Sequence, residues 1–244
     1  MKTEFRFENR FLASAVLAGL FFGACSTAPT QKAKDADTLT EQACRAGKDT
    51  KKVTGSVWLK ADSKEASGQF PAQVTVESPD HLVMEVTNLI GATEAIIRVE
   101  HEQYSIDIPS RKNQKAQDVK GQGTWGGIPL RWATDLFLGK IPCPSPEVLK
   151  QSSRLVSPDG NLVIQTPQKE FYEYSFGENG QDAVPQSLHY ESKTVASAGK
   201  AASVLRVDFK FEDPEPKTLS PRKWEAKSDR GEVRVRWKDR AVSH

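Results

Sequence analysis

Residues 70–99 read FPAQVTVESPDHLVMEVTNLIGATEAIIRV, and apolar and polar side chains alternate through most of this stretch. Successive side chains of a β-strand point to opposite faces of a sheet, so a period of two predicts strands that bury one face. Residues 78–80 (SPD) and 88–91 (NLIG) interrupt the pattern and separate three strands. The inward positions expected in these strands are Phe70, Ala72, Val74 and Val76; Leu82, Met84 and Val86; and Thr93, Ala95, Ile97 and Val99.

The same alternation returns along the rest of the chain, with short turns between the runs. Parallel strands need long crossover connections, usually helical, and the sequence does not contain repeated ones. The pattern therefore predicts a large antiparallel sheet with one apolar face. The inward positions of these further strands are Tyr104, Ile106 and Ile108; Tyr172, Tyr174 and Phe176; Leu205, Val207, Phe209 and Phe211; and Val233, Val235 and Trp237.

Two helices are expected. Thr38 and Glu41 have the spacing of a capping box, which predicts a short helix that runs to Ala46 and ends at Gly47. A second helix should follow Pro129 and end at Gly139, because proline is common in the first turn and glycine just past the last. Its apolar stripe, formed by Leu130, Ala133, Leu136 and Phe137, would cover the concave side of a strongly curved sheet.

The N-terminus resembles the signal of a bacterial lipoprotein. Residues 11–24 (FLASAVLAGLFFGA) carry no charge and would rise about 21 Å as a helix, short of the roughly 30 Å hydrocarbon core. A cleaved signal peptide over residues 1–24 fits better than a membrane span. Cys25 closes a lipobox-like segment, and the resemblance implies that it is lipidated. Because Ser26 follows, it also implies the periplasmic leaflet of the outer membrane, the alternative being an ordinary secretory signal.

Composition narrows the function further. The formal net charge of the 244-residue chain is only +2 and basic residues are interspersed with acidic ones, so nucleic acid is not expected as a partner. Residues 25–244, which remain after removal of the signal peptide, are enough for one domain with a sizeable core. Cys44 and Cys143 would remain after lipidation of Cys25. In the oxidising periplasm they either form a disulfide or stay as two buried thiols, and the sequence leaves both open.

The hairpin tip at residues 87–94 (TNLIGATE) carries two aliphatic residues, Leu89 and Ile90, where Asn, Asp, Ser and Gly are usual. They could fold back on the rim of the sheet. In a protein tethered to a bilayer they could instead enter the lipid, where two aliphatic side chains contribute roughly 3–6 kcal/mol of burial.

At this point the chain resembles the LolB family of outer-membrane lipoprotein receptors, which share a fold with the periplasmic carrier LolA. Residues 87–94 are similar to the family's hairpin, with Ile90 at the position of its protruding leucine. Ile128-Pro129-Leu130 and residues 136–142 (LFLGKIP) are similar to its helix motif, and residues 231–237 (GEVRVRW) to its last strand. The resemblance covers about residues 53–242.

The resemblance implies a mainly β protein with a few helices, in which a half-open antiparallel barrel has a helical lid. Residues 25–52 would form the lipidated N-terminus, a flexible tether and a short helix, and residues 53–244 the half-barrel domain. Its apolar cavity would receive acyl chains of lipoproteins from a LolA-like carrier. Leu89 and Ile90 would insert into the membrane. We expect the protein to be a monomer.

Ten side chains are candidates for lining this cavity, although alternation marks an inner face without showing that it is hollow. They are Phe70, Val74, Met84, Val86, Ile97, Val99, Tyr104, Ile106, Leu136 and Phe137. The four histidines have no metal-ligand spacing, and no nucleophile motif is present, so no catalysis, metal or cofactor is expected. The alternative function is a non-catalytic envelope lipoprotein that binds another lipid or a protein partner.

Overall fold

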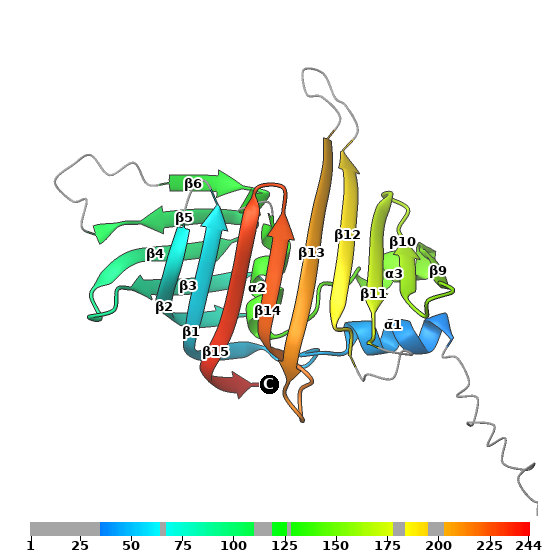
Figure 1. The fold of residues 1–244 in the computed structure, drawn as a ribbon, viewed down its shortest axis with the longest axis horizontal. Coiled ribbons are helices and arrows are strands. Elements are labelled where there is room, and N and C mark those ends of the chain that lie inside the picture. Colours follow the sequence, from blue (N-terminus) through cyan, green and yellow to red (C-terminus); the bar gives the residue numbers. More distant parts are fainter. Residues whose placement is uncertain (1–34, 64–66, 110–118, 126–127, 178–183, 195–202) are drawn as a thin grey trace, which may run out of the picture. The chain divides into compact units, whose positions relative to one another are not determined.

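A 13-stranded antiparallel sheet dominates the computed structural model, which describes residues 35–63, 67–109, 119–125, 128–177, 184–194 and 203–244. The strand order is β6-β5-β4-β3-β2-β1-β15-β14-β13-β12-β11-β10-β9, and β7 and β8 form a separate pair. Strands β6 and β9 are not hydrogen-bonded to each other, so the sheet stays open (Figure 1). This confirms the predicted half-open barrel.

The elements have the following bounds. The helices are α1 (Ala36–Cys44), α2 (Leu130–Leu138) and α3 (Pro146–Gln151). The strands of the first half are β1 (Lys52–Ser63), β2 (Ser67–Glu77), β3 (His81–Thr87), β4 (Thr93–Glu100), β5 (Gln103–Asp107), β6 (Val119–Gln122), β7 (Thr124–Trp125) and β8 (Ile128–Pro129). Those of the second half are β9 (Ser153–Val156), β10 (Leu162–Gln165), β11 (Glu170–Ser175), β12 (Ser187–Thr194), β13 (Ser203–Pro214), β14 (Pro221–Ser228) and β15 (Gly231–Ser243).

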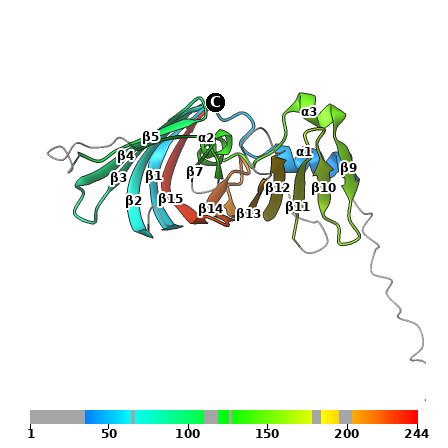
Figure 2. The ribbon, with the colours of Figure 1, turned by 90° about the horizontal axis from the view of Figure 1, so that it is seen from above.

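The sheet curves around α2, which lies on its concave side (Figure 2). Helix α2 packs against β1, β2, β3 and β4, as expected for the helix predicted after Pro129. It is more deeply buried than an amphipathic lid, because Trp132, Thr134 and Leu138 are buried in addition to the predicted stripe. A helix buried on most sides belongs to the core of a domain. Helix α3 and the four-residue strands β9 and β10 were not predicted, because such short segments show too little periodicity.

The start of α1 corrects the sequence-based expectation. The helix begins at Ala36, and the N-cap is Asp35, whose Oδ1 accepts a hydrogen bond from the Thr38 backbone N–H at 2.7 Å. Thr38 therefore lies in the first turn, and the predicted capping box at Thr38 and Glu41 was wrong. Asp35, three residues before Thr38, starts the helix earlier because its side chain satisfies one of the free N–H groups of the first turn. The helix ends at Cys44, two residues before the predicted end.

Cys44 and Cys143 are joined by a disulfide, with their Cα atoms 5.7 Å apart. The bridge ties the end of α1 to the segment that follows α2. Helix α1 also packs against β9 and β10, so it is part of the folded unit and not of a free tether. Cys25 and the predicted signal peptide lie outside the described residues.

Helix α2 ends at Gly139, whose φ of +80° is in the left-handed region that favours glycine. A Cβ atom at this position would collide with Arg240 Nη2 and with the Ser220 side chain. The turn residue Gly160 has a similar φ of +82°, but a Cβ there would meet nothing within 4 Å. Comparing substitutions at these two glycines therefore separates the effect of backbone strain from the effect of crowding.

We expect Gly139→Ala to lower the free energy of unfolding by about 3 kcal/mol, from left-handed strain plus overpacking. Gly160→Ala should cost only the strain, about 1–2 kcal/mol. Urea unfolding of the two variants checks this. Equal losses would show that Arg240 and Ser220 yield freely to a methyl group.

Candidate functional site

Four of the predicted cavity residues, one from each of β2 to β5, form an apolar row across the concave face. Val74 lies opposite Met84 on β3, Met84 opposite Ile97 on β4, and Ile97 opposite Ile106 on β5. Pairing in register brings residues up to 32 positions apart in the sequence onto one surface. The antiparallel ladder thus assembles the surface that the alternation predicted.

The side chains on this surface are less buried toward β5. Seven of the ten predicted residues are buried: Val74, Met84, Val86, Ile97, Val99, Leu136 and Phe137. Tyr104 and Ile106 of β5, and Phe70 near the start of β2, are only half-buried and pack against the core. The concave face is thus most covered where α2 packs on β1 to β4, and the apolar side chains of β5 beyond it are partly accessible. Whether these residues line an acyl-chain cavity stays a prediction.

The α2 residues Phe137 and Leu136 are both buried in the core. Phe137 makes edge-to-face contacts with Trp224 of β14 and Trp237 of β15, at centroid distances of 5.4 and 6.2 Å. Its ring therefore packs on the middle of the sheet. Leu136 is fully buried in the same core.

Sequence reasoning missed a polar and aromatic cluster at the start of α2. Arg131 donates from Nη2 to Glu170 Oε1 at 2.6 Å and to the Tyr190 hydroxyl at 3.1 Å. Glu170 also accepts from the hydroxyls of Tyr190, at 2.9 Å, and Tyr172, at 3.2 Å. Trp132 packs edge-on against Tyr190, with centroids 4.4 Å apart. The cluster fixes the start of α2 to β11 and β12.

Burial and charge set the protonation of this cluster. Burial alone would raise the pKa of Glu170, but the hydrogen bond and charge of Arg131 outweigh it and lower that pKa. Burial, aided by the Glu170 charge, raises the pKa of Tyr172, and burial is also the main cause that raises the pKa of Tyr190 to about 12. At neutral pH an ionised carboxylate therefore accepts from two neutral phenols and one guanidinium.

The end of α2 is held by Arg240 of β15. This side chain is only 1% exposed, pairs with Glu215 at 2.8 Å and donates to the Leu138 carbonyl at 2.7 Å. It thereby satisfies a carbonyl that has no partner within the helix. Arg240 and the Arg131 cluster fix both ends of α2 to the β11–β15 half of the sheet, and the disulfide ties the segment after α2 to α1. The residue pattern within single segments did not predict these contacts, because all three join segments far apart in the sequence.

The second candidate feature is the β3–β4 hairpin tip. Leu89 is 82% exposed and Ile90 is 91% exposed, so neither folds back on the rim of the sheet. They are the most exposed large apolar side chains among the described residues. The surfaces of soluble proteins carry scattered apolar residues, but two adjacent ones at a hairpin tip form a small continuous apolar patch.

Asn88 organises this tip. Its Oδ1 accepts hydrogen bonds from the backbone N–H groups of Ile90, at 3.1 Å, and Ala92, at 2.9 Å. Its Nδ2 donates to Glu94 Oε1 at 2.8 Å, and its backbone N–H donates to the Ala92 carbonyl at 2.9 Å. The turn is therefore held by several bonds while its two aliphatic side chains face solvent.

Neither a membrane-spanning helix nor a metal-binding cluster is found among the described residues. None of the helices there combines the length and the apolar character needed to cross a bilayer. Nor do the described parts of the chain contain a group of three or more His, Cys, Asp or Glu side chains placed to hold a metal ion.

No protein-family model matches the sequence, and no curated protein does. Several solved structures are similar in outline. A LolA superfamily protein from Nitrosomonas europaea has a TM-score of 0.47 and 13% identity, over 87% of this chain and 95% of that one. A DUF1329 family protein from Desulfovibrio piger has a TM-score of 0.48 and 5% identity, over 81% and 88%. An outer membrane lipoprotein-sorting protein domain from Vibrio parahaemolyticus has a TM-score of 0.45 and 6% identity, over 86% and 92%. Similarity at these levels is no ground for assigning a function.

Proposed function

We propose that this protein is a lipoprotein of the outer membrane that binds acyl chains of other lipoproteins and helps insert them into that membrane. The observation that carries the proposal is the hairpin tip, where Leu89 and Ile90 are exposed on a turn held by Asn88. An exposed apolar tip of this kind can insert into a bilayer, and lipidation of Cys25 would hold the protein at one. The partly accessible apolar side chains of Tyr104 and Ile106 on β5 support chain binding on the concave face.

Transfer by such a protein requires no covalent step. Acyl chains pass from a soluble carrier to this protein if they bind more tightly here, and pass on if the bilayer holds them more tightly still. The binding surface must therefore be apolar but incompletely packed around the chain. The decrease in cover from β4 to β5 agrees with this requirement, since the β5 side of the row offers apolar contact without the full enclosure found under α2.

The tip would act at the last step. Burial of Leu89 and Ile90 in lipid contributes roughly 3–6 kcal/mol, which would place the hairpin in the membrane while the cargo leaves. An acidic side chain at the same position would oppose this by roughly 2–4 kcal/mol, depending on depth.

Ile90→Glu is therefore expected to fold and to bind acyl chains while its delivery to liposomes slows at least about tenfold, because 1.4 kcal/mol corresponds to a factor of ten. A reconstituted assay with carrier, acylated lipoprotein and liposomes measures delivery, and a fluorescent fatty acid measures uptake. Leu155→Glu is the matched control, because Leu155 is also an exposed aliphatic residue, at 52%, but lies on β9 away from the tip.

The control should deliver normally. Normal delivery by Ile90→Glu would refute the role of the tip, and equal slowing in both variants would point to a general effect of added charge. Absence of saturable fatty-acid binding to the unchanged protein would instead favour an envelope lipoprotein that acts through a protein partner.

A further inference from the structure

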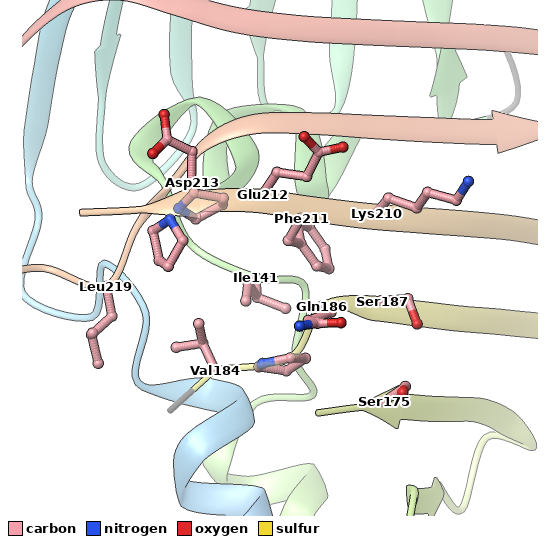
Figure 3. A pocket seen from close by; sticks show the side chains of 13 residues that line it. Ile141, Ser175, Val184, Gln186, Ser187, Lys210, Phe211, Glu212, Asp213 and Leu219 are labelled. Carbon is pink, nitrogen blue, oxygen red and sulfur yellow. The ribbon is translucent and has the colours of Figure 1, made fainter. Parts of the chain in front are cut away.

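A second apolar site is present at the ends of β11, β12 and β13. A cavity of about 740 Å³ lies there, with Ile141, Val184, Phe211 and Leu219 among its lining residues. Figure 3 shows these four side chains around one space, with Gln186 beside Ile141. Its volume is within the roughly 300–1,000 Å³ of pockets that bury most of a small ligand.

This pocket is distinct from the apolar row of β2 to β5. Strands β1, β15 and β14 lie between β2 and β13 in the sheet. Phe211 stacks on Phe209, with centroids 6.0 Å apart, and Phe209 contacts Trp132 of α2 at 5.7 Å. These rings and α2 fill the sheet's centre, so a chain in the pocket and one at β5 would not share contacts.

The wall that carries Leu219 is a fixed turn between β13 and β14. Its residue Glu215 accepts from the buried Arg240 and from the Thr218 hydroxyl, each at 2.8 Å. The Leu219 backbone N–H donates to the Glu215 carbonyl at 2.8 Å. The turn is also joined to the α1 side of the fold, because the Gly47 N–H donates to the Thr218 carbonyl at 3.0 Å.

The wall that carries Ile141 is fixed equally well. The buried Tyr174 hydroxyl donates to the Pro142 carbonyl at 2.8 Å, and the next residue, Cys143, is bridged to Cys44. Both walls are thus held by bonds that do not involve a ligand. A preformed pocket loses little conformational freedom on binding, which favours affinity.

Two of the five non-glycine residues with positive φ in the described chain line this pocket: Asp213, at +58°, and Leu219, at +57°. A bulky residue in the left-handed region is unusual and strained. Strain of this kind persists where the surrounding structure imposes it, commonly at functional sites. Here it keeps an aliphatic side chain at the pocket in a turn position where glycine or asparagine would be more stable.

The chemistry of the lining indicates the ligand class. The four residues named above carry no polar side-chain atom. Ser175, Gln186 and Ser187 also line the pocket, as do the exposed Lys210, Glu212 and Asp213. A pocket that combines apolar side chains with polar and charged ones suits a molecule with an apolar tail and a polar head. We infer that this pocket binds one alkyl chain of a single-chain amphiphile and leaves its headgroup at the rim.

The test titrates a fluorescent C16 fatty acid into the full-length chain carrying Cys25→Ala, so that no acyl chain of its own competes. In this background Leu219→Asn should weaken pocket binding at least tenfold. Asparagine tolerates the left-handed region, so the fold should be kept while an apolar wall becomes polar. Gln186→Trp should weaken binding likewise by filling the space, since Gln186 is an exposed lining residue.

Lys169→Asn is the matched control, because Lys169 has a φ of +62° in the turn before β11 and does not line the pocket. It should bind as the unchanged protein does. Unchanged binding in both Leu219→Asn and Gln186→Trp would overturn the inference; if Leu219→Asn fails to fold by circular dichroism, Gln186→Trp alone decides.

This inference is independent of the proposed function, and the stoichiometry distinguishes their failures. If both hold, two chains bind, and Ile106→Gln removes one while Leu219→Asn removes the other. If only the pocket binds, a single chain is bound, sensitive to Leu219→Asn and insensitive to Ile106→Gln. If only the concave row binds, the single chain shows the opposite sensitivity and the pocket proposal is overturned.

Discussion

The double substitution Cys44→Ala with Cys143→Ala is expected to lower the free energy of unfolding by about 4–5 kcal/mol. The two cysteines are 99 residues apart, so the bridge removes much of the conformational freedom of the unfolded chain. Both are only half-buried, so truncation to alanine leaves little cavity and the loss should come mainly from the unfolded state.

Urea unfolding in the Cys25→Ala background measures this loss, with dithiothreitol-treated protein as a second reference. The reduced protein and the double variant should unfold at the same urea concentration, because both lack only the bridge. Quantitative labelling of Cys44 and Cys143 in unfolded, unreduced protein would contradict the pairing itself.

Arg240→Leu should cost about 3–5 kcal/mol, because breaking a buried ion pair from one side leaves the other charge uncompensated. Glu215, whose side chain is 22% exposed, would keep only the Thr218 hydroxyl as a partner, and the Leu138 carbonyl would lose its donor. Burial is the main influence on the Arg240 guanidinium and lowers its pKa, while the Glu215 charge acts against this. The environment is therefore one in which an unpaired charge is expensive.

The matched control is Arg234→Leu on the same strand. Arg234 pairs with Glu225 at 2.9 Å and with Glu232 at 2.5 Å, but its side chain is 51% exposed and such pairs contribute about 1 kcal/mol or less. Hydrogen exchange gives a second readout, because Arg240→Leu should lower protection selectively at the end of α2. Similar losses of stability in the two variants would show that the burial of Arg240 is unimportant.

The periodicity of single segments was enough to predict a large antiparallel sheet and the seven strands β2 to β5, β11, β13 and β15. Alternation in residues 70–99 gives the inner faces of β2, β3 and β4, and the structure places Val74, Met84 and Ile97 in one row. The hairpin between Thr87 and Thr93 was also predictable, as was its aliphatic tip, because turn chemistry is local. Helix α2 followed from proline and glycine at its ends for the same reason.

Only the tertiary structure decided how these elements are fastened together. Arg240 meets Leu138 across 102 residues and Cys44 meets Cys143 across 99, and no local pattern encodes either contact. The same holds for Arg131 with Glu170, and for the pocket built from segments near Ile141, Val184 and Leu219. Alternation fixes which face of a strand is apolar. Which distant side chains share that face depends on strand order and register, which arise when the whole sheet forms.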